Sequence, residues 1–162
     1  MAAVIILLSV WFVPLVDVLA IEREDSGKII AYGRLEDGET FEIRFIHSIH
    51  KTPVIESYHL QDGQIVQDRI EYSEFAIGMP SNAEHGETFS VEDGYYSVSG
   101  MNRALDQLDI RIAQLFPEHG LTIRNQYIAF SSVAKPSSWI RLNARKISLW
   151  QMMKGANLLG RN

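Results

Sequence analysis

Short stretches of alternating apolar and polar residues, separated by Asp-Gly pairs, run along the chain from residue 28 to residue 147. Asp-Gly supplies the positive φ angles that a tight two-residue hairpin requires. Three such pairs occur, at 37–38, 62–63 and 93–94. Side chains that alternate between two faces indicate strands with one buried face. The pattern therefore predicts a mainly β domain, built either as an antiparallel β-sandwich or as an open barrel.

The expected strands are short and evenly spaced. They cover residues 28–34, 40–47, 54–60, 65–72, 88–91, 95–98, 121–124, 127–133 and 139–144. Two further segments, 102–116 and 147–159, have the apolar spacing of a helix, although 109–112 also fits a strand. We therefore expect one or two short helices beside the strands. A chain of 162 residues suits a single domain, expected over 21–162, with a leader before it.

Residues 2–20 form an apolar run that is interrupted only by Pro14 and Asp17 among the residues that disfavour a membrane span. About 20 apolar residues cross a bilayer core, and residues 18–20 fit a small-residue cleavage site. The run predicts an N-terminal hydrophobic helix over 1–20, acting as signal peptide or membrane anchor, and an extracytoplasmic, periplasmic body. A buried core helix is the alternative. The positive-inside rule favours a cytoplasmic body instead, because the run has basic residues only after it.

Composition excludes several classes of site. The chain has no cysteine, so disulfides, thiolate zinc sites and a cysteine nucleophile are absent. All 20 acidic residues lie at or before Glu118, whereas seven basic residues follow it. This basic end, with Trp139 and Trp150, suits an anionic membrane surface. Alternatively, strands from the two halves are neighbours and their charges neutralise across a sheet. A net charge of −5 argues against nucleic acid as a partner.

Polar groups concentrate in residues 47–56, between two expected strands. His47 continues an apolar face, and Glu56 is the odd member of the face that Tyr58 shares. If these strands pair, His47 and Glu56 should approach each other on the core side, because an unpaired buried charge is costly. The candidate binding residues in this turn are His47, Ser48, His50, Thr52, Pro53 and Glu56.

The same turn contains residue types that bind metals or take part in catalysis. His47, His50 and Glu56 would ligate a metal only if the turn begins at Ser48; otherwise His47 is a satisfied core residue and His50 is exposed. No second His-rich motif supports a metal, so none is predicted. Ser48 beside His47 does not make a nucleophile–base pair, and no Gly-x-Ser-x-Gly elbow is present. We therefore expect no enzymatic activity.

A second polar loop covers residues 77–86. Gly78 and Pro80 shape it, and His85 is its titratable candidate for binding. Loops on a β scaffold often carry binding residues, although a plain connection fits as well. The chain has neither phosphate-cradling glycine motif, and no cofactor is expected.

The segments Phe45–Glu56 and Phe75–Pro80 resemble a family of small exported domains of unknown function, encoded beside or fused to the permeases of TAXI-type TRAP transporters. The matching residues are His47, Ser48, Thr52, Pro53, Glu56, Gly78 and Pro80. His50 departs from the pattern, which usually has a charged residue there. The resemblance implies a non-catalytic accessory protein that contacts the permease or the solute-binding protein, held at the membrane through residues 2–20. A small-ligand or metal-binding module that uses the His47/His50/Glu56 turn is the alternative.

Overall fold

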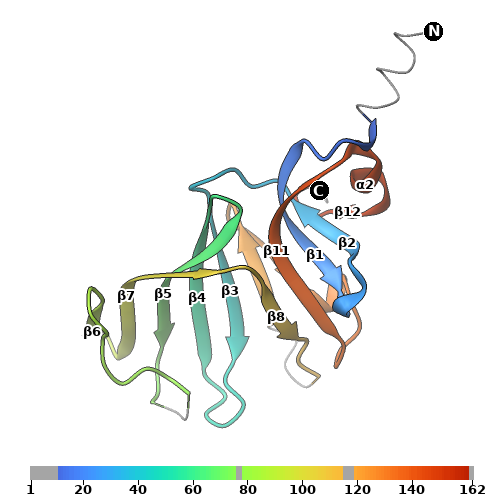
Figure 1. Ribbon diagram of the computed structural model, residues 1–162. Coiled ribbons are helices and arrows are strands. Elements are labelled where there is room, and N and C mark those ends of the chain that lie inside the picture. The colour runs from blue at the N-terminus through green and yellow to red at the C-terminus, as the bar shows by residue number, and fades with distance from the viewer. Residues whose placement is uncertain (1–10, 76–77, 115–118, 161–162) are drawn as a thin grey trace, which may run out of the picture.

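The computed structural model describes residues 11–75, 78–114 and 119–160, and strands dominate it (Figure 1). The strands are β1 (Val16–Arg23), β2 (Lys28–Gly33), β3 (Thr40–Ile46), β4 (Pro53–Gln61), β5 (Gln64–Tyr72), β6 (Thr88–Glu92), β7 (Tyr95–Leu105), β8 (Leu108–Arg111), β9 (Gly120–Ile123), β10 (Gln126–Ala129), β11 (Trp139–Ile147) and β12 (Ala156–Asn157). Helix α2 covers Leu149–Lys154, and the 3₁₀ turns η1 and η2 cover Glu24–Ser26 and Phe130–Ser132.

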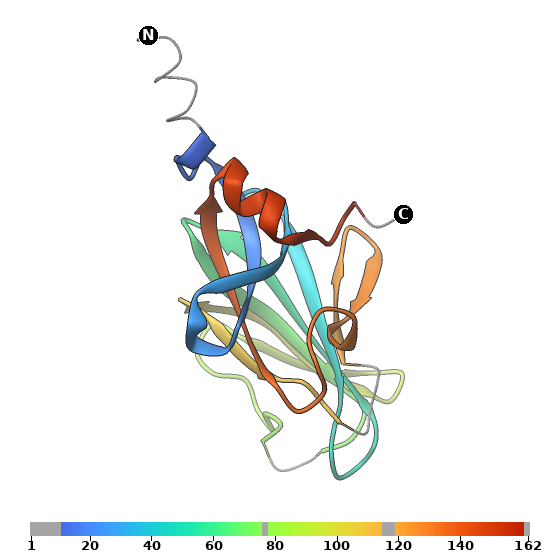
Figure 2. The same ribbon diagram turned by 90° about the vertical axis from the view of Figure 1, so that its right-hand side faces the viewer.

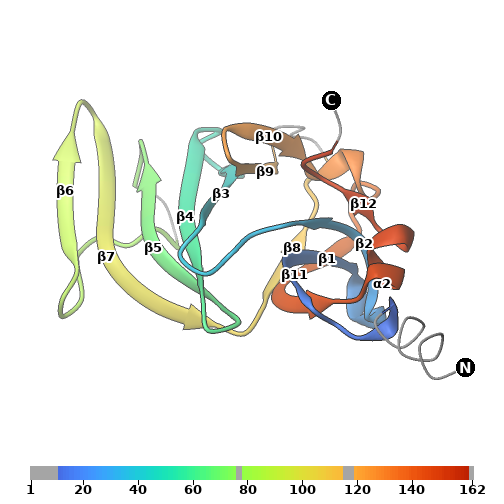
Figure 3. The ribbon, with the colours of Figure 1, turned by 90° about the horizontal axis from the view of Figure 1, so that it is seen from above.

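The strands form two sheets. One has five strands in the order β12-β2-β1-β11-β8, and the other has seven in the order β10-β9-β3-β4-β5-β7-β6. Within the described ranges the paired strands run antiparallel, except that β12 lies parallel to β2. The expected mainly β, largely antiparallel class is therefore confirmed. Viewed from above, the seven-stranded sheet extends far beyond the five-stranded one on the β5, β7 and β6 side (Figure 3).

The main core fills the space between the two sheets. Leu19 and Leu142 project into it from the five-stranded sheet, and Phe41 and Ile43 project from the seven-stranded sheet. All four are almost fully buried. Since burying one such side chain contributes roughly 1.5–3 kcal/mol, this cluster holds the sheets together.

The prediction that the hydrophobic leader helix extends to residue 20 is wrong. Residues 16–20 belong to β1, which lies between β2 and β11 near the centre of the five-stranded sheet. Leu19 packs into the main core, whereas Val18 and Ala20 pack on the opposite face with Ile147. A strand buried on both faces has a continuous apolar sequence, which periodicity cannot distinguish from a membrane segment.

The remainder of the predicted leader falls mostly on residues 1–10, which lie outside the described residues. Among the residues that the structure describes, no helix has both the length and the apolar character needed to cross a bilayer. Trp11 and Phe12 begin the described chain beside α2, so both ends of the domain meet at one end of the molecule (Figure 2).

The helix expected over 102–116 is wrong for the described residues 102–114, and the alternative of a strand at 109–112 is confirmed by β8. The helix expected over 147–159 is confirmed in part. Residues 102–105 continue β7, and 108–111 form β8 in the other sheet, so the chain crosses between sheets here. Both Leu105 and Leu108 pack against the main core, which explains their helix-like spacing. Helix α2 begins after a capping box, in which the Ser148 hydroxyl accepts from the Gln151 amide at 3.3 Å.

Two of the three Asp-Gly pairs make hairpins. Asp62 and Gly63 have φ angles of 51° and 76°, and Asp93 and Gly94 have 51° and 81°. They join β4 to β5 and β6 to β7, as expected. The pair at 37–38 instead links β2 to β3, which belong to different sheets.

Charges from the two halves of the chain neutralise each other across the strands, which confirms that interpretation. Lys146 Nζ on β11 lies 2.7 Å from Asp17 Oδ2 on β1, and Arg145 Nη1 lies 2.5 Å from Glu22 Oε1. Further pairs of this kind are Arg141 with Asp109 and Arg124 with Glu39.

A chain that begins at Ile21 should fail to fold, whereas one that begins at Leu15 should fold. The shorter chain loses Val18, Leu19 and Ala20, three of the five buried residues of β1. Each lost Val or Leu costs roughly 1.5–3 kcal/mol out of a typical total of about 5–15 kcal/mol. Circular dichroism and thermal unfolding of both chains check this. A cooperative transition at the same temperature in both would contradict a structural role for residues 16–20.

Candidate functional site

The loop between β3 and β4 is built around His47. Its backbone amide donates to the Thr52 carbonyl at 2.9 Å, and the Lys51 amide donates to the His47 carbonyl at 3.0 Å. The ring contributes as well, because the Ile49 amide donates to His47 Nδ1 at 3.3 Å. An acceptor at Nδ1 leaves the proton of the neutral ring on Nε2. His47, 9% exposed, is therefore the internal support of this loop.

The described residues of the second motif segment, Phe75 and Gly78–Pro80, lie at the same end of the seven-stranded sheet (Figure 1). His50 Nδ1 lies 2.7 Å from the Glu74 carboxylate, which follows β5. The buried Tyr72 hydroxyl donates to the Pro80 carbonyl, and Gly78 adopts a φ of 93°. This end of the sheet therefore brings together the described residues of both motif segments except Glu56. His85 is exposed and lies in the loop before β6.

The expected approach of His47 and Glu56 is wrong. In the β3–β4 register Glu56 is opposite Ile43, four residues before His47, which corresponds to about 13 Å along the strand. Each group has another partner: Glu56 Oε2 accepts from the Tyr58 hydroxyl at 2.8 Å, and His47 accepts from a backbone amide. The two strands do pair, but the loop between them is longer than a tight turn.

Glu56 instead lies in a pocket of about 480 Å³ between the two sheets. One wall comes from β3, β4 and β5, and the opposite wall from β8, the edge strand of the five-stranded sheet. Its lining is largely apolar, with Glu56, Tyr58, Gln67 and His119 among the polar groups. Asp109 and Arg111 of β8 also line it.

Burial shifts the pKa of three of the titratable side chains that line the pocket. Desolvation raises the pKa of Glu56, and the hydrogen bond from Tyr58 offsets this only in part. Desolvation and the adjacent Glu56 carboxylate raise the pKa of Tyr58 far above its ordinary value. Burial lowers the pKa of His119. In the pocket, burial therefore favours the neutral form of both the Glu56 carboxyl group and the His119 imidazole.

His119 is held firmly although it lies in a connection before β9. The Ala113 amide donates to its Nδ1 at 3.3 Å, and its ring packs edge-on against Phe130 at a centroid distance of 5.1 Å. Sequence reasoning missed His119 because only the β8–β9 connection brings it to the pocket. Tyr58, in contrast, shares a strand face with Glu56, so the two-residue spacing was a usable signal.

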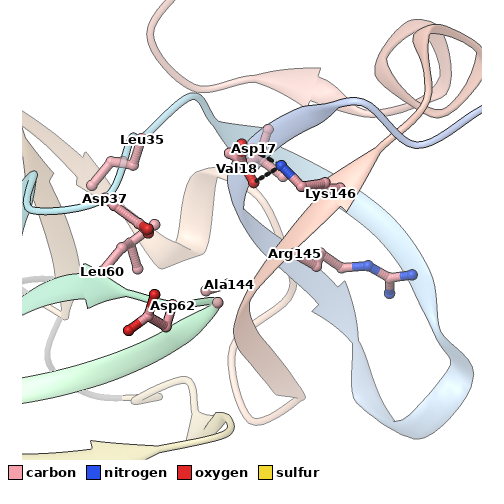
Figure 4. Close-up of a pocket in the computed structure, with 10 residues that line it drawn as sticks. Asp17, Val18, Leu35, Asp37, Leu60, Asp62, Ala144, Arg145 and Lys146 are labelled. Atoms are coloured by element: carbon pink, nitrogen blue, oxygen red, sulfur yellow. Dashed lines mark hydrogen bonds and ion pairs between the residues drawn. The ribbon is translucent and has the colours of Figure 1, made fainter.

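A second pocket, of about 300 Å³, is lined by three aspartates (Figure 4). The ion pairs at this pocket join strands of the fold. Asp17 is bound by Lys146, whereas Asp37 and Asp62 come from two turns on the other side of the pocket. Arg145 points away from them (Figure 4) and binds Glu22. Among the described residues, no group of three or more His, Asp or Glu side chains is arranged to hold a metal ion. Within that part of the chain, His47, His50 and Glu56 therefore do not come together as a ligand set.

Comparison with protein families gives one match, to the model described as Domain of unknown function (DUF1850), over residues 41–130. The chain belongs to this family. The DUF1850 match contains both motif segments and every residue that lines the Glu56 pocket. Strands β1, β2 and β11 and helix α2 lie outside it. No curated protein matches the chain, and no solved structure does.

His47→Ala should destabilise the domain by about 1–3 kcal/mol, because it removes a buried ring together with the acceptor of the Ile49 amide. His50→Ala is the matched control: its side chain is one-third exposed, and such a surface pair is worth less than about 1 kcal/mol. Urea unfolding of the two variants measures both effects. Equal losses would contradict the supporting role of the His47 ring.

Glu56→Gln should be more stable than the parent protein at neutral pH. Since the folded-state pKa of Glu56 is raised above 4.5, the parent loses stability as pH rises from about that value through the folded pKa, and the loss levels off above it. Glutamine removes this loss while still accepting from Tyr58. Unfolding free energies between pH 3 and 8 should therefore diverge in favour of Glu56→Gln as pH rises, as roughly expected from linkage. A difference independent of pH would contradict the burial of Glu56 as an ionisable group.

Proposed function

We propose that this DUF1850 domain is a non-catalytic binding module whose ligand site is the Glu56 pocket. The observation that supports this proposal is a carboxyl group with a raised pKa in a largely apolar pocket between the sheets. An apolar residue at this position would stabilise the fold more, since burying a carboxyl group is costly. A volume of about 480 Å³ suits a small molecule.

The lining favours a small organic molecule with an amine or hydroxyl group. Such a donor would bind Glu56, and the Gln67 amide would complete its hydrogen bonds. The apolar part of the ligand would pack against Phe45, Leu105 and Ile110. A cationic amine would also supply the counter-charge that ionised Glu56 needs in this pocket. This proposal replaces the site at the His47/His50/Glu56 turn with the pocket between the two sheets.

Thermal unfolding with a panel of alkyl amines, amino alcohols and matched carboxylic acids tests this site. An amine or alcohol at about 100 times its Kd should raise Tm by about 5–10 °C, which corresponds to about 2.7 kcal/mol. Glu56→Gln should abolish the amine response, whereas Gln64→Ala, on the same sheet but outside the pocket lining, should retain it. Equal responses in both variants, or a response only to acids, would refute the assignment.

We infer that the domain acts as an extracytoplasmic accessory component of a TAXI-type TRAP system, in contact with its permease or solute-binding protein. The motif resemblance supports this role, and so does the surface at the motif end of the sheet. Ile49 is 61% exposed there, and Phe75 is 44% exposed. Both residues lie at this end of the sheet, because their chain neighbours His50 and Glu74 are 2.7 Å apart. Exposed apolar side chains are enriched at protein-binding surfaces.

A photo-crosslinking residue at Ile49 should capture the permease or the solute-binding protein in intact cells. The same residue at Tyr127, which is 49% exposed on β10, is the control and should not capture them. A periplasm-only reporter fused after residue 162 tests the location independently. Capture at both positions, or an inactive reporter, would argue against this context.

A further inference from the structure

Helix α2 turns its apolar side chains outward. Leu149, Trp150 and Met153 are 38%, 39% and 68% exposed, whereas Met152 packs inward against the cluster beneath β1. Met153 is four residues from Leu149 and three from Trp150, so it neighbours both on the helix surface and the three side chains form a continuous apolar strip. A short helix of this kind would normally turn such a strip toward the core.

The segment before β1 extends this strip. Phe12 and Leu15 are both 59% exposed, and Trp11 is 41% exposed. The ring centroids of Phe12 and Trp150 are 5.9 Å apart. Figure 2 shows the start of the described chain beside α2, at the end of the molecule where β11 leads into the helix. We call this surface the terminal apolar patch: Trp11, Phe12, Val13, Leu15, Leu149, Trp150 and Met153.

We propose that the terminal apolar patch docks the folded domain on a lipid bilayer, with α2 lying in the membrane–water interface. The ten residues that lead into the patch contain no Asp, Glu, Lys, Arg or His, so the adjoining chain is also suited to hydrocarbon. Trp150 carries the Lys154 ammonium over its ring at 4.4 Å. Trp and Lys are the residues that place an apolar body below lipid headgroups and a polar tip among them.

This arrangement defines the orientation of the domain. Strand β11 runs from Trp139 to Ile147 directly into α2, and eight steps of about 3.3 Å place Trp139 about 26 Å from the patch. The motif loops lie at this far end, opposite α2 (Figure 1). Docking through α2 therefore presents the His47 loop away from the lipid, where soluble proteins can reach it.

Single-tryptophan forms of the full chain test the proposal. One keeps Trp150, with Trp11→Phe and Trp139→Phe, and the control keeps Trp139, with Trp11→Phe and Trp150→Phe. The two tryptophans are 39% and 47% exposed, so they are matched in solvent access. Each form is bound to vesicles of phosphatidylcholine and phosphatidylglycerol whose acyl chains carry bromine, which quenches tryptophan at the depth where interfacial helices lie.

Trp150 should lose about half of its emission or more, and Trp139 should be almost unaffected, because an interfacial helix buries its apolar face about 5–10 Å deep. Unquenched Trp150 on vesicle-bound protein would overturn the proposal, since residues 1–10 would then bind the vesicle without α2. Equal quenching of both residues would also overturn it. A lipid-free dimer that shields Trp150 would identify a second copy as the occupant and refute lipid docking.

Nitroxide labels give an independent measurement, because the chain has no native cysteine. Met153→Cys and Ile49→Cys place labels at sites that are 68% and 61% exposed. On vesicles, the Met153→Cys label should become accessible to oxygen and protected from a water-soluble nickel complex, whereas the Ile49→Cys label should stay accessible to nickel. The same nickel access at both sites would contradict docking through α2.

Discussion

The antiparallel pairing of β1 with β11 is the contact on which the rest of the structure depends. Eight consecutive residues of β1 are in register with β11, and both strands contribute fully buried side chains to the core. This pairing joins residues more than one hundred positions apart and places Arg145 and Lys146 of the basic end against Glu22 and Asp17. It also fixes the position of β8, which pairs with the other edge of β11.

Two surfaces follow from that pairing. Strand β8 is the far wall of the Glu56 pocket, so the pocket exists only because the five-stranded sheet assembles beside the seven-stranded one. Helix α2 follows β11 after Ser148, and the chain before β1 reaches it, since the Leu15 amide donates to the Ile147 carbonyl at 3.2 Å. The same interaction therefore builds the Glu56 pocket and assembles the terminal apolar patch at the other end of β11.

The Glu56 carboxyl group and the His47 imidazole have different physical roles. His47 accepts from a backbone amide inside its own loop, which is a structural use of a buried polar group. Glu56 accepts from Tyr58 but keeps a raised pKa, so its burial is compensated only in part. A group whose burial is only partly compensated on a pocket wall is where a ligand has most to contribute. The His47 loop thus shapes one end of the sheet, and the pocket contains the buried carboxyl group that a ligand could bind.

The sequence by itself determined the strands from β2 to β6, the hairpins at 62–63 and 93–94, and the shared face of Glu56 and Tyr58. These features are local, because side-chain alternation and the φ angles of Asp-Gly act over a few residues. It also suggested α2, whose capping box is local too. Only the tertiary structure decided that residues 16–20 form a strand, since an apolar run fits a membrane segment and a doubly buried strand equally well. Likewise, β7 and β8 divide the segment 102–116 between two sheets, and His119 reaches the pocket, because packing across the core selects among conformations that the local pattern leaves equal.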